Sequence, residues 1–214
     1  MIRKIIFAFS TSFILFFLGQ TLSAETTGPK AIQNIVNAPL PQTELTDIEL
    51  KSDKIRLLAA SSTLPPDKSA NYEVSNLLDD NEGTAWVEGD AAAGMGEKLI
   101  FVMDPDAKFN FFGIRNGYCG TADLWQKNGR VKSLAVELVY ESGRIERKKF
   151  SLDDSREEQF FLFDELDNIK ISRLDPIAVV TLAIAETYKG SRYNDTCLSA
   201  LVPGYLYYAP RTIE

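Results

Sequence analysis

Hydrophobic and polar positions alternate with a period of two along much of this chain. In residues 133–140, Val136, Leu138 and Tyr140 take every second place, which is typical of an antiparallel strand with one buried face. Similar runs, rich in Val, Ile, Phe and Tyr and separated by turn-forming residues, predict further strands. The predicted strands cover residues 55–60, 98–103, 109–115, 133–140, 144–151, 159–163, 177–188 and 198–208.

Helical periodicity is weak by comparison. Residues 72–78 could form a short helix and residues 120–129 a brief helical turn, while Glu-Ser-Gly-Arg at 141–144 is typical of a hairpin turn. Several short strands with so little helix predict an all-β fold, an antiparallel β-sandwich, in one domain over residues 54–208. Residues 209–214 would then be a C-terminal tail.

The N-terminus has the order of a secretory signal peptide. Basic residues at 3 and 4 precede an apolar stretch over residues 5–19, and Ser23 and Ala24 precede a cleavage point before Glu25. The apolar stretch is shorter than the roughly 20 residues of a membrane span, although an uncleaved anchor is the alternative. We therefore expect export to the periplasm or the cell surface, with no stable membrane span. Residues 25–53, which lack a sustained apolar period, are expected to be a flexible linker.

Composition and charge exclude several classes of function. The chain has 214 residues and no histidine, so a Ser-His-Asp triad, a Cys-His dyad and a histidine-ligated zinc site cannot form. Residues 1–24 hold two of the 23 basic residues and none of the 30 acidic ones, which leaves a net charge of −9 on residues 25–214. Such an acidic protein is a poor partner for nucleic acids and anionic lipids. Carboxylate chemistry, an oxygen-ligated metal such as calcium, and binding without chemistry remain.

The chain has two cysteines, Cys119 and Cys197. In an oxidising compartment the even number predicts one disulfide, which would stabilise the fold by roughly 4–5 kcal/mol because it closes a long loop of the unfolded chain. The alternative is two buried free thiols, since the sequence does not show that the sulfur atoms meet.

Residues 76–86, NLLDDNEGTAW, combine an acidic turn with a tryptophan. Asp79, Asn81 and Thr84 could present oxygen atoms from one turn, and oxygen is the ligand atom that calcium takes. The alternative is an acidic turn whose side chains cap their own backbone, and the residues alone favour this second interpretation. Trp86 is better explained as a core residue than as a binding residue.

The same segment resembles the Asp loop of the discoidin, or galactose-binding-like, superfamily. Further similar segments follow in order: TAWVEG at 84–89, GMGE at 94–97, NGY at 116–118, LWQKNGRVK at 124–132 and YKGSRYNDTCLS at 188–199. Over roughly residues 57–202 they are similar to the NADase-type glycan-binding domain, a discoidin-like module. The resemblance implies a discoidin-like β-sandwich, or jelly roll, that binds a ligand. It does not imply NAD hydrolysis, because the catalytic domain of proteins with this module is a separate unit.

The chain departs from the resemblance at one point that concerns calcium. Family members usually have Ser-Glu-Ile where residues 199–201 are Ser-Ala-Leu, and a carboxylate near this point completes the calcium site of many discoidin-type lectins. Ala200 therefore removes a ligand, which weakens an oxygen cage for calcium. We expect no required cofactor, with structural calcium at Asp79, Asn81 and Thr84 as the candidate.

Aromatic and amide residues in the matched segments predict a glycan site. Sugars bind where an aromatic ring meets the apolar face of a sugar while amides and carboxylates bond its hydroxyls. The predicted ligand-binding residues are Glu88, Asn116, Tyr118, Trp125, Asn128, Tyr193 and Asp195. The alternative is that Tyr118 packs in the core and that Asn116 only shapes a turn.

We therefore predict an exported, non-catalytic module that binds a glycan or cell-surface glycoconjugate through loops at one end of the sandwich. The alternative is a protein-interaction or structural surface domain that uses the same loops, since this fold alone does not choose the ligand. A hydrolase that works with carboxylates alone, such as Glu88 and Glu97, is less favoured because a sandwich of this size leaves little room for a deep cleft.

Overall fold

The computed structural model describes residues 43–50, 54–68, 70–90, 93–163 and 175–210. The expected signal peptide, residues 25–42 and 51–53 of the expected linker, and residues 211–214 of the expected tail lie outside this part of the chain. Within the described residues, no helix is long and apolar enough to cross a membrane.

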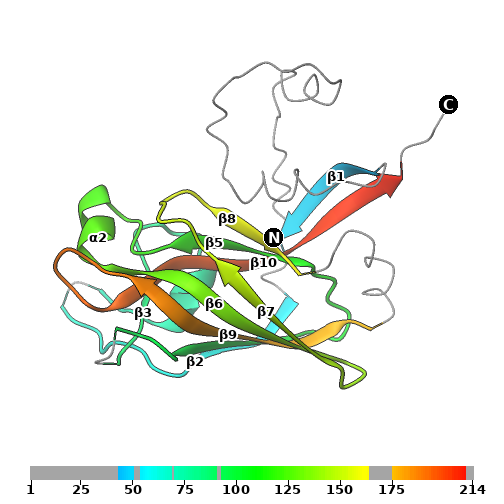
Figure 1. The fold of residues 1–214 in the computed structure, drawn as a ribbon, viewed down its shortest axis with the longest axis horizontal. Helices are drawn as coiled ribbons and strands as arrows, with labels where there is room; N and C mark the ends of the chain where they lie inside the picture. Colours follow the sequence, from blue (N-terminus) through cyan, green and yellow to red (C-terminus); the bar gives the residue numbers. More distant parts are fainter. Residues whose placement is uncertain (1–42, 51–53, 69, 91–92, 164–174, 211–214) are drawn as a thin grey trace, which may run out of the picture.

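Strands make up most of the described chain (Figure 1). The elements before β10 are β1 (Thr43–Leu50), β2 (Ile55–Ala60), the 3-10 helix η3 (Val74–Leu78), β3 (Trp86–Val87), β4 (Lys98–Met103), β5 (Phe111–Asn116), α2 (Ala122–Lys127), β6 (Gly129–Tyr140), β7 (Ile145–Ser151), β8 (Gln159–Leu162) and β9 (Ile177–Tyr188). Strand β10 (Thr196–Pro210) ends the described chain. All eight predicted strands, both short helical segments and the hairpin turn between β6 and β7 are confirmed.

The strands form two packed layers. The first contains β2, β4, β9, β6 and β7 in this order, and the second contains β10, β5 and β8, with β3 beside the start of β10. The layers join where β10 runs parallel to β6 for two residues, with Thr196 beside Gly129 and Cys197 beside Arg130. The other pairings between named strands of the described chain are antiparallel, as a sandwich of this kind predicts.

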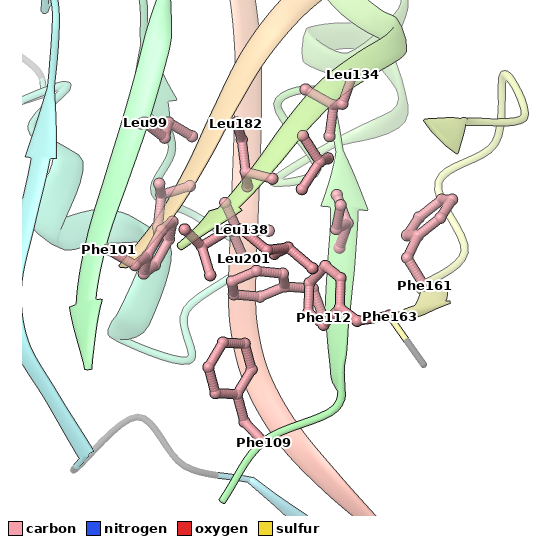
Figure 2. Close-up of a cluster of buried hydrophobic side chains, with 14 of the residues drawn as sticks. Leu99, Phe101, Phe109, Phe112, Leu134, Leu138, Phe161, Phe163, Leu182 and Leu201 are labelled. Atoms are coloured by element: carbon pink, nitrogen blue, oxygen red, sulfur yellow. The ribbon is translucent and has the colours of Figure 1, made fainter. Parts of the chain in front are cut away.

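The hydrophobic core lies between the layers (Figure 2). Phe112 of β5 is at its centre, with ring centroids 5.1 Å from Phe101 of β4, 5.9 Å from Phe109 and 5.2 Å from Phe163. Because these rings come from both layers, their packing holds the two sheets together. Trp86 is fully buried in the same core, which confirms its assignment as a core residue.

The structure differs from the sequence expectation at the two ends of the domain. Residues 43–50, expected within a flexible linker, form β1, and β10 continues to Pro210, beyond the expected start of the tail. The two strands pair antiparallel from Thr43 opposite Pro210 to Leu50 opposite Gly204 and form a ribbon at one side of the sandwich (Figure 1). Apolar residues at 45, 48 and 50 do not alternate, so the pattern of β1 gives no strand signal.

Phe112→Ala should lower the free energy of unfolding by about 3–5 kcal/mol, because it removes a buried ring and leaves a cavity between the layers. Leu57→Ala is the matched control: Leu57 is 53% exposed on β2, and its loss should cost less than about 0.5 kcal/mol. Chemical denaturation of both variants measures the difference. Equal losses in the two variants would contradict this position of the core.

Candidate functional site

Five connections meet at one end of the sandwich, which we call the loop end. They are the described parts of residues 61–73, 79–97, 117–128, 152–158 and 189–195. These connections gather because β2, β5, β7 and β9 end there while β4, β6, β8 and β10 begin there. In Figure 1, α2 and the β9–β10 connection mark this end at the left. The predicted binding and metal-ligating residues all lie in these connections or at the last residue of β5.

Arg130, the second residue of β6, holds the loop end together. Its buried guanidinium donates two hydrogen bonds to the carboxylate of Asp154, from Nε to Oδ1 at 2.6 Å and from Nη2 to Oδ2 at 3.1 Å. Further N–H groups donate to the carbonyls of Trp125, Asn128 and Lys189 at 3.2, 2.7 and 3.4 Å. The guanidinium also lies over the Trp125 ring, 4.4 Å from its centroid. One side chain therefore joins α2, the β7–β8 connection and the β9–β10 connection.

Asn116 and Trp125, both predicted to bind ligand, are part of this framework. The amide of Asn116 is buried, donates from Nδ2 to the Val131 carbonyl at 2.7 Å and accepts from the Val131 N–H at 2.9 Å, which joins β5 to β6. The indole Nε1 of Trp125 donates to the carbonyl of Asn116 at 2.8 Å. Gly117 lies against this indole at φ +92°, where an added Cβ would be 2.7 Å from Trp125 Cδ1. The geometry therefore supports the alternative in which Asn116 shapes the turn.

Asn128 is buried and ends helix α2. Its Nδ2 and its backbone N–H both donate to the Leu124 carbonyl, at 2.8 and 3.2 Å. At the other end of the helix, Thr121 Oγ1 accepts from the Leu124 N–H at 3.1 Å. A helix of six residues is not stable by itself, so these caps and the contacts with Arg130 maintain it. The Asn128 side chain therefore caps the C-terminal end of α2.

Glu88 is enclosed in the loop end and has no exposed surface. Its Oε1 accepts from the Thr196 N–H at 3.0 Å and its Oε2 from the Asp90 N–H at 2.6 Å. Burial raises the pKa of the Glu88 carboxyl above its ordinary value, and the two backbone N–H groups oppose that rise. Gly94 closes over the carboxylate, since an added Cβ would lie 2.7 Å from Glu88 Cγ. This carboxylate holds the β3–β4 connection to β10, so its geometry gives no support to a hydrolase built on Glu88 and Glu97.

The exposed part of the loop end carries the other predicted ligand residues. Tyr193 is 39% exposed, and Tyr118, Trp125 and Asp195 are half-buried. The hydroxyl of Tyr118 donates to the Gly83 carbonyl at 3.2 Å, which places its ring beside the acidic turn rather than in the main core. The structure therefore separates the seven predicted residues into a buried group that builds the loop end and an outer group that solvent can reach.

The β9–β10 connection packs against the end of α2. The N–H of Ser191 donates to the Gln126 carbonyl at 2.9 Å, and the N–H groups of Arg192 and Tyr193 donate to the Lys127 carbonyl at 3.1 and 2.8 Å. The Arg192 guanidinium lies 5.2 Å from the centroid of the Tyr193 ring. Gln126, Arg192 and Tyr193 are exposed, and we call these three residues the outer rim. The sequence prediction did not include Gln126, and its place within segment 124–132 gave no sign that it would be exposed.

The acidic loop, residues 79–84, satisfies its own hydrogen bonds. Asp79 accepts from the Asn81 N–H at 2.9 Å and from the Thr84 hydroxyl at 2.7 Å. Asn81 Oδ1 accepts from the Gly83 N–H at 2.9 Å, and the Asn81 carbonyl accepts from the Thr84 hydroxyl at 2.8 Å. The described residues contain no group of three or more Cys, Asp or Glu side chains placed to hold a metal ion. The loop oxygens that were predicted to hold calcium thus accept or donate hydrogen bonds within the loop, which is the self-capped alternative, and calcium binding stays a prediction.

Cys119 and Cys197 are buried free thiols, and the predicted disulfide is not formed. Cys119 Sγ lies 3.5 Å from the Asn116 carbonyl and 3.7 Å from that of Gly117, whereas Cys197 Sγ lies 3.7 Å from the Asp195 carbonyl. Each sulfur atom thus faces the backbone of its own segment. Burial raises the pKa of both thiols, which keeps them protonated at neutral pH.

Glu158 precedes β8 and lies opposite Arg115 if the β5–β8 register is continued by one residue. An added Cβ on Gly113 would be 2.7 Å from Glu158 Oε1, so glycine leaves the space that this carboxylate occupies. Burial raises the pKa of the Glu158 carboxyl, Asp80 and Glu82 add to the rise, and Arg115 opposes it.

Arg130→Met should destabilise the protein by about 2 kcal/mol or more, because it leaves the carbonyls of Trp125, Asn128 and Lys189 without their donor, while the exposed Asp154 carboxylate is hydrated. Arg147→Met is the control: Arg147 pairs with Glu137 at 2.7 Å but is 72% exposed, so its loss should cost under about 1 kcal/mol. Chemical denaturation measures both variants. The assignment of Arg130 as the framework residue is wrong if the two losses are the same.

Glu158→Gln should raise the melting temperature at pH 7. A carboxyl whose pKa is raised in the folded state destabilises the fold once the unfolded chain can ionise. The neutral amide therefore relieves a cost that begins above the ordinary pKa of glutamate and is complete above the raised pKa. The gain should shrink as the pH falls and disappear below about pH 4, near the ordinary pKa of glutamate, where both states are protonated. Thermal melts over this pH range test the sign; a gain that grows on acidification would contradict it.

Comparisons with known proteins agree with the fold. A family model described as NAD glycohydrolase translocation F5/8 type C domain matches residues 50–202. The structure resembles the family 32 carbohydrate-binding module from Clostridium perfringens NanJ, solved with galactose, at TM-score 0.51 and 11% identity over 73% of this chain and 97% of that one. It also resembles the CBM32-1 and CBM32-2 domains of Clostridium perfringens ZmpB, at TM-score 0.50 and 10% identity over 83% of this chain and 38% of that one. No curated protein matches the chain.

At such low identity, the two structural similarities bear on the fold and confirm the predicted discoidin-like β-sandwich. The family model supports a stronger conclusion than the structural similarities. It matches well over half of the 214 residues, including all of the sandwich from β2 to the middle of β10. The chain belongs to the family of NAD glycohydrolase translocation F5/8 type C domains.

Proposed function

We propose that this chain is an exported, non-catalytic module that binds a glycan at the outer rim of its loop end. The observation that carries the proposal is the position of Tyr193, an exposed ring with the Arg192 guanidinium 5.2 Å from its centroid, on a connection whose backbone is bonded to the exposed Gln126. A ring offers a surface for the apolar face of a sugar, and the guanidinium and amide offer hydrogen bonds to its hydroxyls.

The predicted ligand residues divide into two roles under this proposal. Tyr193 touches the sugar, and the half-buried Asp195 and Trp125 flank it from the β9–β10 connection and α2. Glu88, Asn116 and Asn128 position these connections through hydrogen bonds with backbone groups and do not contact the ligand. Tyr118 lies against the acidic loop through its hydrogen bond to the Gly83 carbonyl.

The carbohydrate class is supported by the similar structures, since the NanJ module was solved with galactose and the ZmpB domains are also named as family 32 modules. Export is supported by the signal-peptide order of residues 1–24. A binding role without catalysis is supported by Glu88, because a carboxylate enclosed by backbone cannot reach a substrate.

Tyr193→Ala should weaken binding of a terminal galactose-type glycan by about tenfold or more, because the stacking surface is lost while the fold keeps its buried groups. The experiment is a glycan array with the purified full-length expression product, followed by titration of the bound glycan. Ile145→Ala is the matched control, since Ile145 is 52% exposed on β7 near the hairpin at the opposite end.

A glycan bound equally well by the wild type and by Tyr193→Ala would place the site elsewhere. Absence of any glycan binding by a protein that melts cooperatively would reject the glycan proposal and favour a protein partner at the same loops.

A further inference from the structure

The acidic loop carries an excess of negative charge that requires a counter-charge. Asp79, Asp80 and Glu82 are exposed within four consecutive residues, and the Glu158 carboxylate lies close enough for Asp80 and Glu82 to raise its pKa. Neighbouring like charges repel each other, so a nearby cation stabilises this arrangement.

Arg115 supplies that counter-charge from β5. Its Nη1 lies 2.8 Å from Glu82 Oε1, and its side chain is 27% exposed, so the pair is partly shielded from water. Arg115 also lies opposite Glu158 when the β5–β8 register is continued by one residue, and its charge opposes the rise in the pKa of the Glu158 carboxyl. The pair with Glu82 thus connects the acidic loop to β5.

The position opposite Arg115 on the neighbouring strand is a small residue. In the β5–β10 pairing, Ala200 lies directly across from Arg115. Ala200 is also the position where the family resemblance implies a carboxylate that completes a calcium site. In this chain the carboxylate is absent, and an arginine from the adjacent strand occupies the neighbourhood with its own positive charge.

The loop is already packed where Arg115 acts on it. Tyr118 donates to the Gly83 carbonyl at 3.2 Å, and a Cβ added to Gly120 would lie 3.3 Å from the Glu82 carbonyl. The loop backbone is thus held on one side by Tyr118 and closed on itself by Asp79 and Asn81, and the pair of Arg115 with Glu82 adds a contact to β5.

We propose that Arg115 is the resident cation of the acidic loop and fixes it to β5 in place of a calcium ion, so that the loop end keeps its shape without metal. The inference does not depend on the glycan proposal, because it concerns the stability of the loop and is measured without a sugar.

The test compares thermal melts of the wild type and of Arg115→Gln, each with calcium chloride and with EDTA, on the purified full-length expression product. The wild type should melt within about 1 °C in the two solutions, whereas a calcium site occupied well above its dissociation constant would raise the melting temperature by several degrees. Arg115→Gln should melt about 2–4 °C lower, the shift expected when a partly shielded ion pair is lost from a domain of this size.

Hydrogen exchange shows where the stability is lost. The N–H groups of Asn81, Gly83 and Thr84 are bonded within the loop, so they should exchange faster in Arg115→Gln. Glu82→Gln removes the other half of the pair and should give the same local change, and the double variant should be no worse than either single variant. Arg147→Gln, which breaks the exposed pair with Glu137, is the control that should leave loop exchange unchanged.

Calcium that raises the melting temperature of the wild type by several degrees overturns the proposal. The proposal is also overturned if the loop N–H groups exchange at the wild-type rate in both Arg115→Gln and Glu82→Gln. If Arg115→Gln does not fold, Glu82→Gln decides alone, since Glu82 is 59% exposed and its replacement leaves no buried charge behind.

Discussion

The loop end depends on the buried guanidinium of Arg130. A buried cation is tolerated only where its charge is paired and its N–H groups have acceptors, so the Asp154 carboxylate and the carbonyls of Trp125, Asn128 and Lys189 must stay where the guanidinium can reach them. These acceptors belong to three different connections. The requirement of one side chain therefore fixes α2 relative to the β9–β10 connection, and the outer rim lies on the surface that those two segments form.

The same physical rule explains why amides and a carboxylate are buried at this end. Connections that cross over the top of a sandwich expose backbone groups that have no strand partner, and each such group needs a hydrogen bond. Glu88 supplies acceptors for two N–H groups, Asn116 serves both polar groups of Val131, and Asn128 serves the end of α2. Polar residues of the types that recognise sugars are therefore used to complete the framework.

The sequence predicted the fold more completely than the site. Strands such as β4 and β9 have correct ends because one of their faces is buried and the period of two is visible locally. Strand β1 was not predicted because its partner is the distant end of β10 and its own residues do not alternate. The predicted site residues lie together at one end of the sandwich, but the sequence does not distinguish the roles of Asn116 and Tyr193, which are both loop-end residues of sugar-binding types. The structure distinguishes the two residues: the Asn116 amide is bonded to Val131 inside the sandwich, whereas the Tyr193 ring is exposed to solvent.

The arginines at the loop end differ in what their guanidinium groups contact. The buried Arg130 is paired with the exposed Asp154, and Arg115 is paired with Glu82 near the surface, so each of these two cations stabilises a connection. Arg192 differs, because its guanidinium lies over the exposed ring of Tyr193 and not on a carboxylate that stabilises the fold. Under the glycan proposal, this exposed guanidinium remains able to donate hydrogen bonds to sugar hydroxyls. The two arginines that pair with carboxylates thus hold the connections in place, and the proposal gives the exposed Arg192 the role of a ligand contact.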